Sequence, residues 1–474
     1  MRALLILLTA ALLRFSGSAW ETRFHPDEAW FATFARTAAV HGAWTLPGAL
    51  DKPPLAIYAQ ALSMHLFAVE TTPTGILDLD IYRGEWAARL PSALAGIITV
   101  AAIIAFGRRM GGRRAGDLAG LIAALSPYGI AYSASAFTDG LMVMFIAVGL
   151  AAARPTLRGG AWAGVLIGLA FACKQQGLYA IPFCLALLAA RRSGLHQRLI
   201  AFALALTAVA GVVLLWDAAR SASTGWTSVF AQAAANNDPE RFFPNMSELL
   251  PRLETWLTFV PYLIAASPIW IVLVMAARPR LYRLAWTLLL LTMGYLLAHW
   301  LLRFNLYDRY LLPLLPVSAA LIGGIMARAH RLLMVGLCAT LLISAAAAYR
   351  GDSPIGAAPS AQRDDGRSYA GIDQVAAYLD SRALGAIIYD RWLGWGLDYY
   401  LGAWTDKRRV FYPTPDTLAV GAAAQPDPAP RYFVAPTDMD AAPYLSALEG
   451  VAFGGELAFE QGNFQVYILI REAP

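Results

Sequence analysis

The chain has 474 residues, of which 58% are hydrophobic and 15% are charged, whereas a soluble domain is typically about 25% charged. This composition, with a mean hydropathy of +0.51, excludes an ordinary soluble domain and indicates a membrane protein. The formal net charge of +5 comes from short basic clusters between apolar runs, so we expect membrane lipids as partners and no nucleic acid.

The first apolar stretch, "MRALLILLTAALLRFSGSAW", has two interpretations. It could be a secretory signal peptide cleaved after Ala19, or an uncleaved first membrane helix. Arg14 interrupts the apolar stretch, and the segments that follow need a neighbour in the membrane. The sequence therefore favours an uncleaved helix.

Apolar runs long enough for membrane helices recur up to about residue 350. Several are short, which suggests tilt or partial burial in the protein. We predict an α-helical polytopic membrane protein with about eleven transmembrane helices, near residues 3–20, 88–107, 116–132, 138–153, 160–173, 178–190, 198–217, 257–277, 284–302, 310–327 and 332–349.

The turns between these helices indicate the orientation of the chain. Alternate turns carry the basic clusters "GRRMGGRRAG", "RPTLRGG", "RRSGLHQR", "ARPRLYR" and "ARAHR". Lys and Arg are enriched in cytoplasmic loops, so we place these turns and the N-terminus on the cytoplasmic side of the cell membrane. The extracytoplasmic face then receives the loops 21–87, 133–137, 174–177, 218–256 and 303–309, and the C-terminal tail.

The first outer loop, residues 21–87, mixes aromatic and apolar residues with charge, as amphipathic helices in the membrane interface do. It contains "HPDEAWF" and "LDKPPL". Asp27 and Glu28 could be the N-cap and a first-turn acid of a helix, and Lys52 could simply reach into the interface. However, two prolines hold Lys52 on an extended segment, and a rigid lysine near an acid suits an anionic ligand.

Other charged residues belong to the same outer face: Lys174 in "CKQQG", Arg303 in "LLRFN", Arg309 in "YDRYLLPLLP" and Asp139 in "AFTDG". Charges at helix ends often only anchor a helix in the interface. These residues are far apart in the sequence and meet only if the outer helix ends converge around one cavity. A cavity with three or more cations and one exposed carboxylate would fit a phosphate and a base.

The C-terminal tail follows the linker "SPIGAAPSAQRDDGRS". Helical patterns alternate there with the strand-like runs "GAIIYD", "RRVFYP", "RYFVAP" and "FQVYILI". The alternation favours a small extracytoplasmic α/β domain, residues 350–474, with a largely parallel sheet, after a membrane domain of residues 1–349. No GxGxxG or P-loop motif supports a nucleotide site, so the tail would cap the membrane part or recognise a partner.

No ligand spacing singles out a metal site. Asp78 and Asp80 in "LDLDIY" resemble a DxD metal pair, but a solvated loop is the favoured explanation. Cys173, Cys184 and Cys338 lie in or beside apolar runs, as small core residues do. We expect no obligatory cofactor; a divalent metal is possible but not required.

Five motifs in this order on the outer face resemble those of the polyprenyl-phosphate-dependent glycosyltransferases of the C-type (GT-C) superfamily: "DE" in the first outer loop, "DKPPL", "SAFTDG", "CKQQG" and "RYLLPLLP". The resemblance covers residues 1 to about 330. It is greatest to the bacterial branch that contains the lipid A aminoarabinose transferases, related to protein O-mannosyltransferases. It implies the GT-C fold, a variable extracytoplasmic domain, and transfer of a sugar from a polyprenyl-phosphate carrier to an acceptor outside the cytoplasm.

The resemblance also implies roles for the residues at matching positions. Asp27 would be the general base that takes the proton of the acceptor hydroxyl. Asp139 would orient Lys52, and Asp51 stands where relatives often have a glutamate. The donor phosphate would be held by Lys52, Lys174, Arg309 and the Tyr310 hydroxyl, with Glu28, Asp51, Asp139 and Arg303 in support.

The implied chemistry is coherent, because fixed cations would stabilise the phosphate as its negative charge grows during bond cleavage, at ~3 kcal/mol per partner. One base without a nucleophile partner predicts direct displacement with inversion. The loop 218–256 could close over the site as a lid. The acceptor could be a lipid, a glycan or a protein, and no residue pattern names the sugar.

The alternative function is a transporter or flippase of lipid-linked sugars. A transporter needs polar groups through the membrane midplane and often has an internal repeat. The predicted helix interiors carry few ionisable groups, no repeat is evident, and charge clusters on one face. A purely structural scaffold would leave Asp27, Lys52 and Arg309 unexplained.

Overall fold

A computed structural model of the chain describes residues 1–18, 22–236, 243–264, 283–302, 306–328, 335–336, 338–343, 369–390, 393–402, 407–412, 414–424 and 428–471. The chain divides into two compact units. Unit 1 comprises Met1–Trp20, Ala43–Ser63 and Trp86–Asp365, and unit 2 comprises Glu21–Gly42, Met64–Glu85 and Gly366–Pro474. The predicted domain boundary at residue 350 lies outside the described residues.

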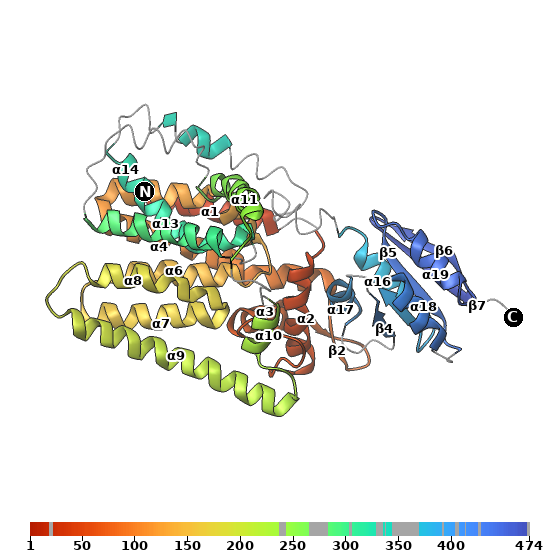
Figure 1. Cartoon of the computed structure of the whole chain (residues 1–474). Helices are drawn as coiled ribbons and strands as arrows, with labels where there is room; N and C mark the ends of the chain where they lie inside the picture. Colours follow the sequence, from red (N-terminus) through yellow and green to blue (C-terminus); the bar gives the residue numbers. More distant parts are fainter. Residues whose placement is uncertain are drawn as a thin grey trace. The chain divides into compact units, whose positions relative to one another are not determined.

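Unit 1 is built from helices (Figure 1). Two of them, α3 and α4, have one end in unit 2. The α-helices are α1 (Arg2–Ser18), α3 (Leu55–Phe67), α4 (Ile81–Ala124), α5 (Pro127–Ala131), α6 (Asp139–Ala152), α7 (Leu157–Cys173), α8 (Ile181–Leu188), α9 (Leu195–Thr224), α10 (Val229–Asn236), α11 (Met246–Ile264), α13 (Arg283–Leu301) and α14 (Leu315–Met326). Short 3-10 helices are η1 (Tyr132–Ala134), η2 (Gln175–Ala180) and η3 (Asp308–Leu314).

Four of the described helical segments are long and apolar enough to cross a membrane: α4, α9, α13, and η3 continued by α14. The apolar helices α6 and α7, and η2 continued by α8, are shorter. The count of about eleven spans therefore stays a prediction, and the predicted last span near 332–349 lies largely outside the described residues.

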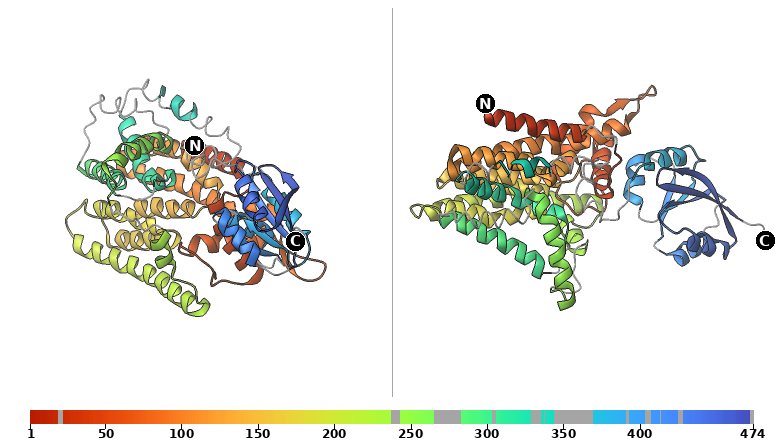
Figure 2. Two further views of the ribbon diagram at one scale, coloured as in Figure 1. Left: turned by 45° about the vertical axis from the view of Figure 1, so that its right-hand side comes forward. Right: turned by 90° about the horizontal axis from the view of Figure 1, so that it is seen from above.

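The helix α7 packs against α6 on one side and α9 on the other (Figure 2). Two glycines allow the close approach to α9. A Cβ on Gly160 would lie 2.5 Å from the Arg198 carbonyl oxygen, and one on Gly164 would clash with the Phe202 carbonyl oxygen. Small residues at a helix interface let two backbones approach each other in this way.

Arg14 of α1 is buried where α4 ends. Its guanidinium donates hydrogen bonds to the carbonyl oxygens of Ala10 (3.2 Å), Ala123 (3.1 Å) and Ala124 (3.2 Å). The last carbonyl groups of a helix have no partner within that helix, so Arg14 satisfies those of α4. This explains the charge that interrupts the first apolar run.

The basic segment "GRRMGGRRAG" contains the predicted turn. The element labelled α4 consists of two helices that meet at Gly112, where the backbone is not helical (φ 85°, ψ −177°). The second helix packs back on the first, since a Cβ on Gly107 would lie 3.0 Å from the Ala119 Cβ and Arg108 pairs with Asp117 at 2.7 Å. A positive φ costs glycine little because glycine has no Cβ. The break between the two predicted helices near 88–107 and 116–132 therefore lies where the sequence placed it, although the second helix ends at Ala124 and is followed by the separate helix α5.

The tail in unit 2 contains a five-stranded sheet with the strand order β4-β3-β5-β7-β6. β3 pairs in parallel with β4 and β5, whereas β7 pairs antiparallel with β5 and β6. The sheet is thus mixed, not largely parallel. Its strands are β3 (Ile387–Asp390), β4 (Arg408–Phe411), β5 (Arg431–Pro436), β6 (Phe453–Gln461) and β7 (Phe464–Arg471), with helices α16 (Ile372–Asp380), α17 (Gly394–Leu401), α18 (Pro415–Ala424) and α19 (Ala442–Glu449).

The first outer loop contributes α2 (Pro26–His41) and a hairpin of β1 (Val69–Thr71) and β2 (Leu77–Leu79) to the same unit. The expected place of this loop's amphipathic helices in the membrane interface stays a prediction. Within unit 2, α2 packs against α17, where Trp30 stacks on Trp395 with ring centroids 5.1 Å apart. Part of its aromatic surface is thus buried inside unit 2.

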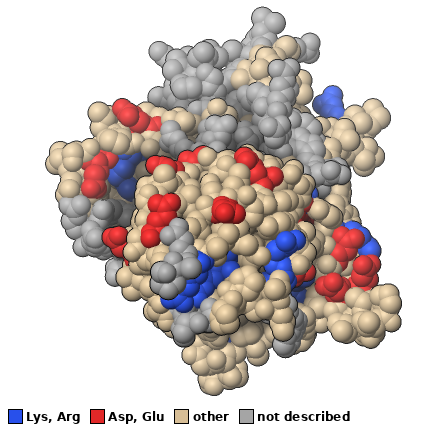
Figure 3. All heavy atoms as spheres, turned by 90° about the vertical axis from the view of Figure 1, so that its right-hand side faces the viewer, with Lys and Arg blue, Asp and Glu red and all other residues tan. Residues whose placement is uncertain are grey.

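One face of the molecule carries both acidic and basic side chains among uncharged ones (Figure 3).

Candidate active site

Lys52 lies in the extended segment before α3, next to its own ion-pair partner. Its Nζ is 2.6 Å from Oδ2 of Asp51, which is buried. Gln175 of η2 donates a hydrogen bond to the Asp51 backbone oxygen (2.7 Å), and Asn236 of α10 donates one to the Asp51 carboxylate (3.4 Å). Asp51 therefore joins three segments of unit 1 and holds the Lys52 ammonium among them.

Lys174 and Asp139 form a second, deeper ion pair. The Lys174 Nζ lies 2.8 and 2.9 Å from the two carboxylate oxygens of Asp139, and the side chains are only 4% and 1% exposed. The expected orientation of Lys52 by Asp139 is thus wrong. Asp139 begins α6 and Lys174 follows the end of α7, so the packing of α6 against α7 brings this pair together instead.

Arg309 and Tyr310 belong to η3. The Arg309 guanidinium lies over two aromatic rings, 5.1 Å from the centroid of Phe137 and 4.4 Å from that of Tyr307. The Lys174 Nζ is 5.3 Å from the ring centroid of Tyr310. Such cation–π contacts hold a cation without neutralising it.

The three cations are close enough to influence one another. Burial lowers the pKa of Lys174, which lies between α7 and η2, to about 8; Asp139 raises it, while Arg309 and Lys52 lower it further. Like charges lower a lysine pKa only at short range. The structure thus brings together Lys52, Lys174, Arg309 and Tyr310 with Asp51 and Asp139; we call these six residues the cation cluster. Arg303 lies outside the described residues.

Asp27 and Glu28 belong to unit 2, at the start of α2. The N-cap is His25, not Asp27: the His25 Nδ1 accepts a hydrogen bond from the Asp27 N–H (3.2 Å), and Glu28 accepts one from the His25 N–H (3.1 Å). This reciprocal capping box stabilises the helix start. Glu28 is buried in this structural role, whereas Asp27 is partly exposed.

Two residues that the sequence analysis did not select also shape unit 1. Asp308 accepts hydrogen bonds from the Tyr132 hydroxyl and the Arg309 N–H, both at 2.6 Å. Arg220 of α9 is buried and donates to the carbonyl oxygens of Leu46 (3.1 Å) and Gly48, in the turn that leads to Asp51. Arg220 could have been selected from the sequence, because it is an arginine near the end of a long apolar helix.

No group of three or more His, Cys, Asp or Glu side chains that could hold a metal ion occurs among the described residues. The two acids of "LDLDIY" have protein partners: Asp80 accepts hydrogen bonds from the N–H groups of Tyr82 and Arg83, both at 3.0 Å, and Asp78 pairs with Arg36 at 3.7 Å. Asp80 therefore caps the start of α4, whereas the Asp78 side chain is 60% exposed and its ion pair is weak.

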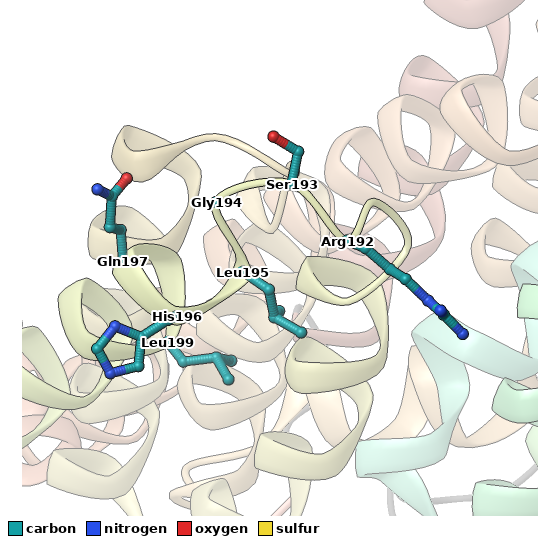
Figure 4. Close-up of a pocket in the computed structure, with 7 residues that line it drawn as sticks. All are labelled: Arg192, Ser193, Gly194, Leu195, His196, Gln197 and Leu199. Carbon is teal, nitrogen blue, oxygen red and sulfur yellow. The ribbon is translucent and has the colours of Figure 1, made fainter.

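A pocket of about 780 Å³ lies at the turn between α8 and α9 (Figure 4). It shares no residue with the cation cluster. Its lining consists of Arg192, Ser193, Gly194, Leu195, His196, Gln197 and Leu199.

Comparisons with known proteins give a family context for this geometry. Residues 51–216 match the family model described as dolichyl-phosphate-mannose-protein mannosyltransferase. "Putative mannosyltransferase YycA" of Bacillus subtilis is 29% identical over 211 residues, which cover 41% of this chain and 29% of YycA. The match to YycA therefore spans less than a third of that relative. The family-model match includes Lys52, Asp139 and Lys174 of this chain.

Several solved structures match nearly the whole chain, ArnT and AglB among them. ArnT from Cupriavidus metallidurans, bound to undecaprenyl phosphate, has a TM-score of 0.66 at 17% identity, and the match covers 98% of this chain and 97% of ArnT. The oligosaccharyltransferase AglB from Archaeoglobus fulgidus, in complex with an inhibitory peptide and a dolichol-phosphate, has a TM-score of 0.53 at 12% identity, covering 97% and 74%. The chain has the GT-C glycosyltransferase fold. The resemblance inferred from the five motifs is thereby confirmed, as is a place in a membrane.

Proposed function

We propose that this GT-C protein is an inverting glycosyltransferase that moves a sugar from a polyprenyl-phosphate carrier to a hydroxyl group of an acceptor on the extracytoplasmic face of the membrane. The observation that carries the proposal is the cation cluster, in which three cations from separate segments meet around two buried carboxylates. Carriers of this kind are bound in the ArnT and AglB structures that share the fold.

The cations of the cluster suit a phosphate monoanion in different ways. The Lys52 side chain is 17% exposed, whereas that of Lys174 is 4% exposed and donates hydrogen bonds to both carboxylate oxygens of Asp139. Lys52 and Arg309 would therefore contact the carrier phosphate directly, one as a point charge and the other as a planar fork. Lys174 would add positive potential without contacting the phosphate, and the Tyr310 hydroxyl would be a further hydrogen-bond donor to it.

This arrangement favours bond cleavage because it acts where charge develops. As the bond between the sugar and the phosphate breaks, the phosphate gains negative charge. Preorganised cations in a site that excludes water stabilise that charge, and losing one partner typically costs about 3–4 kcal/mol of transition-state stabilisation.

Asp27 would be the general base. Its partly exposed carboxylate stands at the second residue of α2, while Glu28 is occupied by the helix cap. A positioned base that takes the proton of the acceptor hydroxyl contributes roughly 10²–10⁴ in rate. With one base and no carboxylate nucleophile assigned, attack by the acceptor displaces the phosphate directly and inverts the sugar carbon.

The test is a transfer assay in detergent with a panel of polyprenyl-phosphate sugars and of lipid, glycan and peptide acceptors. Wild type should release undecaprenyl phosphate and form a glycosylated product. Asp27→Asn should lose at least a hundredfold in turnover and still bind the carrier, because it keeps the size of the side chain. Lys52→Met should weaken binding of the carrier.

The assay also separates the enzyme from the transporter. Cleavage of the donor by wild type but not by Asp27→Asn supports the transferase and the base together. Carrier flipping in liposomes by wild type and Asp27→Asn alike, without donor cleavage under any acceptor, would contradict the transferase and favour the transporter.

A further inference from the structure

The segment that leads into α2 is held by distant residues, all within unit 2. Arg23 forms ion pairs with Glu85 near the start of α4 and with Asp373 of α16, both at 3.2 Å. The Tyr400 hydroxyl of α17 accepts a hydrogen bond from the Phe24 N–H (3.0 Å) and donates one to the Glu85 carboxylate. The two residues directly before the N-cap are thus bonded to both α4 and the tail.

This network is buried, which makes its geometry strict. Phe24, Glu85 and Tyr400 are 1%, 3% and 4% exposed. Burial, together with the Glu85 carboxylate, raises the pKa of Tyr400 well above its usual value of 10, so the hydroxyl stays protonated and can donate. A hydrogen bond to a charged group is stronger than one between neutral groups.

The tail holds α2 at further points. Trp395 of α17 stacks on Trp30 and lies near Phe34, with ring centroids 5.1 and 6.1 Å apart. Arg36, near the end of α2, donates a hydrogen bond to the Tyr399 carbonyl oxygen. The α17 helix therefore contacts the start, the middle and the later turns of α2, and one rigid element fixes the helix that carries Asp27.

We propose that the tail is a positioning domain for the general base, and that Tyr400 acts as a positioning residue for Asp27 through the Phe24 backbone and Glu85. The proposal rests on the proposed function, in which Asp27 takes the acceptor proton. Asp27 follows Phe24 by three residues, so a shift of that backbone moves the carboxylate. A misplacement of 1 Å in a reacting group can cost about 10²-fold in rate, while the carrier phosphate is held elsewhere.

The experiment compares Tyr400→Phe with the matched control Tyr467→Phe in the full chain. The Tyr467 hydroxyl also donates to a side-chain oxygen in the tail, that of Gln465 at 2.8 Å, both on β7. Tyr400→Phe should lower kcat about tenfold or more and leave the Kd for undecaprenyl phosphate within twofold. Tyr467→Phe should leave both unchanged.

A second pair of measurements keeps the proposal testable if Tyr400→Phe loses stability. Glu85→Gln should lower kcat as well, and the double variant should lose little more than the worse single variant, because both act through one contact. Hydrogen exchange of the peptide that covers residues 22–31 should become several-fold faster in Tyr400→Phe, with β3 to β7 unchanged.

The outcomes distinguish this proposal from the proposed function. If Asp27→Asn loses turnover while Tyr400→Phe keeps wild-type kcat, the function stands and the positioning role is overturned. If Asp27→Asn keeps wild-type turnover, the base is wrong and the positioning role falls with it. Faster exchange across the whole tail sheet, with a weaker carrier Kd, would show a general structural role and overturn the proposal too.

Discussion

Replacing Asp139 by asparagine should strongly destabilise the protein, because it leaves the Lys174 ammonium buried without its carboxylate. The two groups are 2.8 Å apart, with side chains 4% and 1% exposed. At an effective dielectric constant of ~20, unit charges at that distance attract by about 6 kcal/mol. Desolvation offsets much of this attraction, but removing one partner of a buried pair typically costs about 3–5 kcal/mol.

Thermal unfolding in detergent would measure this loss. The matched control is Asp117→Asn, whose carboxylate lies 2.7 Å from Arg108 in a pair with side chains 16% and 39% exposed. Breaking a pair near the surface should cost only about 0–1 kcal/mol. Equal midpoints for Asp139→Asn and Asp117→Asn would refute the reasoning, because they would mean that Lys174 is solvated.

A double variant separates stability from binding. Asp139→Leu with Lys174→Met removes both charges, so most of the lost stability should return. If Lys174 adds potential at the carrier phosphate, this stable variant should still bind undecaprenyl phosphate about tenfold more weakly, which corresponds to about 1.4 kcal/mol. Wild-type affinity in the double variant would assign the pair to the fold alone.

Three further changes have defined outcomes. Gly164→Ala should destabilise the α7–α9 contact by about 1–3 kcal/mol through overpacking, whereas Gly211→Ala, with open space at its Cβ, should be neutral or slightly stabilising in the same melting assay. Arg220→Met should leave two carbonyl groups of the turn before Asp51 without their donor and weaken binding of undecaprenyl phosphate several-fold in a titration; unchanged affinity would contradict its role in holding that turn. Burial raises the pKa of Asp390 in the tail sheet from 3.8 to about 6, so its contribution to stability is full below pH ~4 and is lost as the pH rises through ~6. Asp390→Asn should therefore raise the free energy of opening of β3 at pH 7.5 by up to about 3 kcal/mol, and hydrogen exchange of β3 should be slower than in wild type. Equal exchange in the two proteins would argue against a buried, destabilising carboxylate.

The sequence predicted those helices and strands that are determined by the residues within them and at their ends. The helices α6, α7 and α13 lie within three residues of their predicted positions, because apolar runs there end at charged or turn-forming residues, whereas α9 ends seven residues later than predicted. The strands β3, β4, β5 and β7 coincide with the four strand-like runs. The strand β6 was missed because "FGGELAFEQ" contains two glycines and two acids, which disfavour a strand prediction.

Pairing between distant residues could not be predicted in the same way. Lys52 and Asp51 are neighbours in sequence, and their ion pair needs no knowledge of the fold. Asp139 was matched with the wrong lysine, because the choice depends on how α6 packs against α7. No pattern indicated that Trp30 of α2 would stack on Trp395 of the tail, since that contact joins residues more than 300 positions apart.

The burial of Arg14 in unit 1 also has a consequence for the biosynthesis of the chain. A charged residue costs up to roughly 2.5–3.5 kcal/mol, the value at the helix centre, when a membrane helix is inserted alone, and Arg14 lies four residues before the end of α1. Two of the carbonyl groups that Arg14 binds belong to residues 109 and 110 positions later, which a ribosome reaches about 5–20 s afterwards at ordinary rates of synthesis. During that interval α1 carries an arginine whose partners in α4 do not yet exist, so the first helix reaches its stable environment only when the end of α4 has been made.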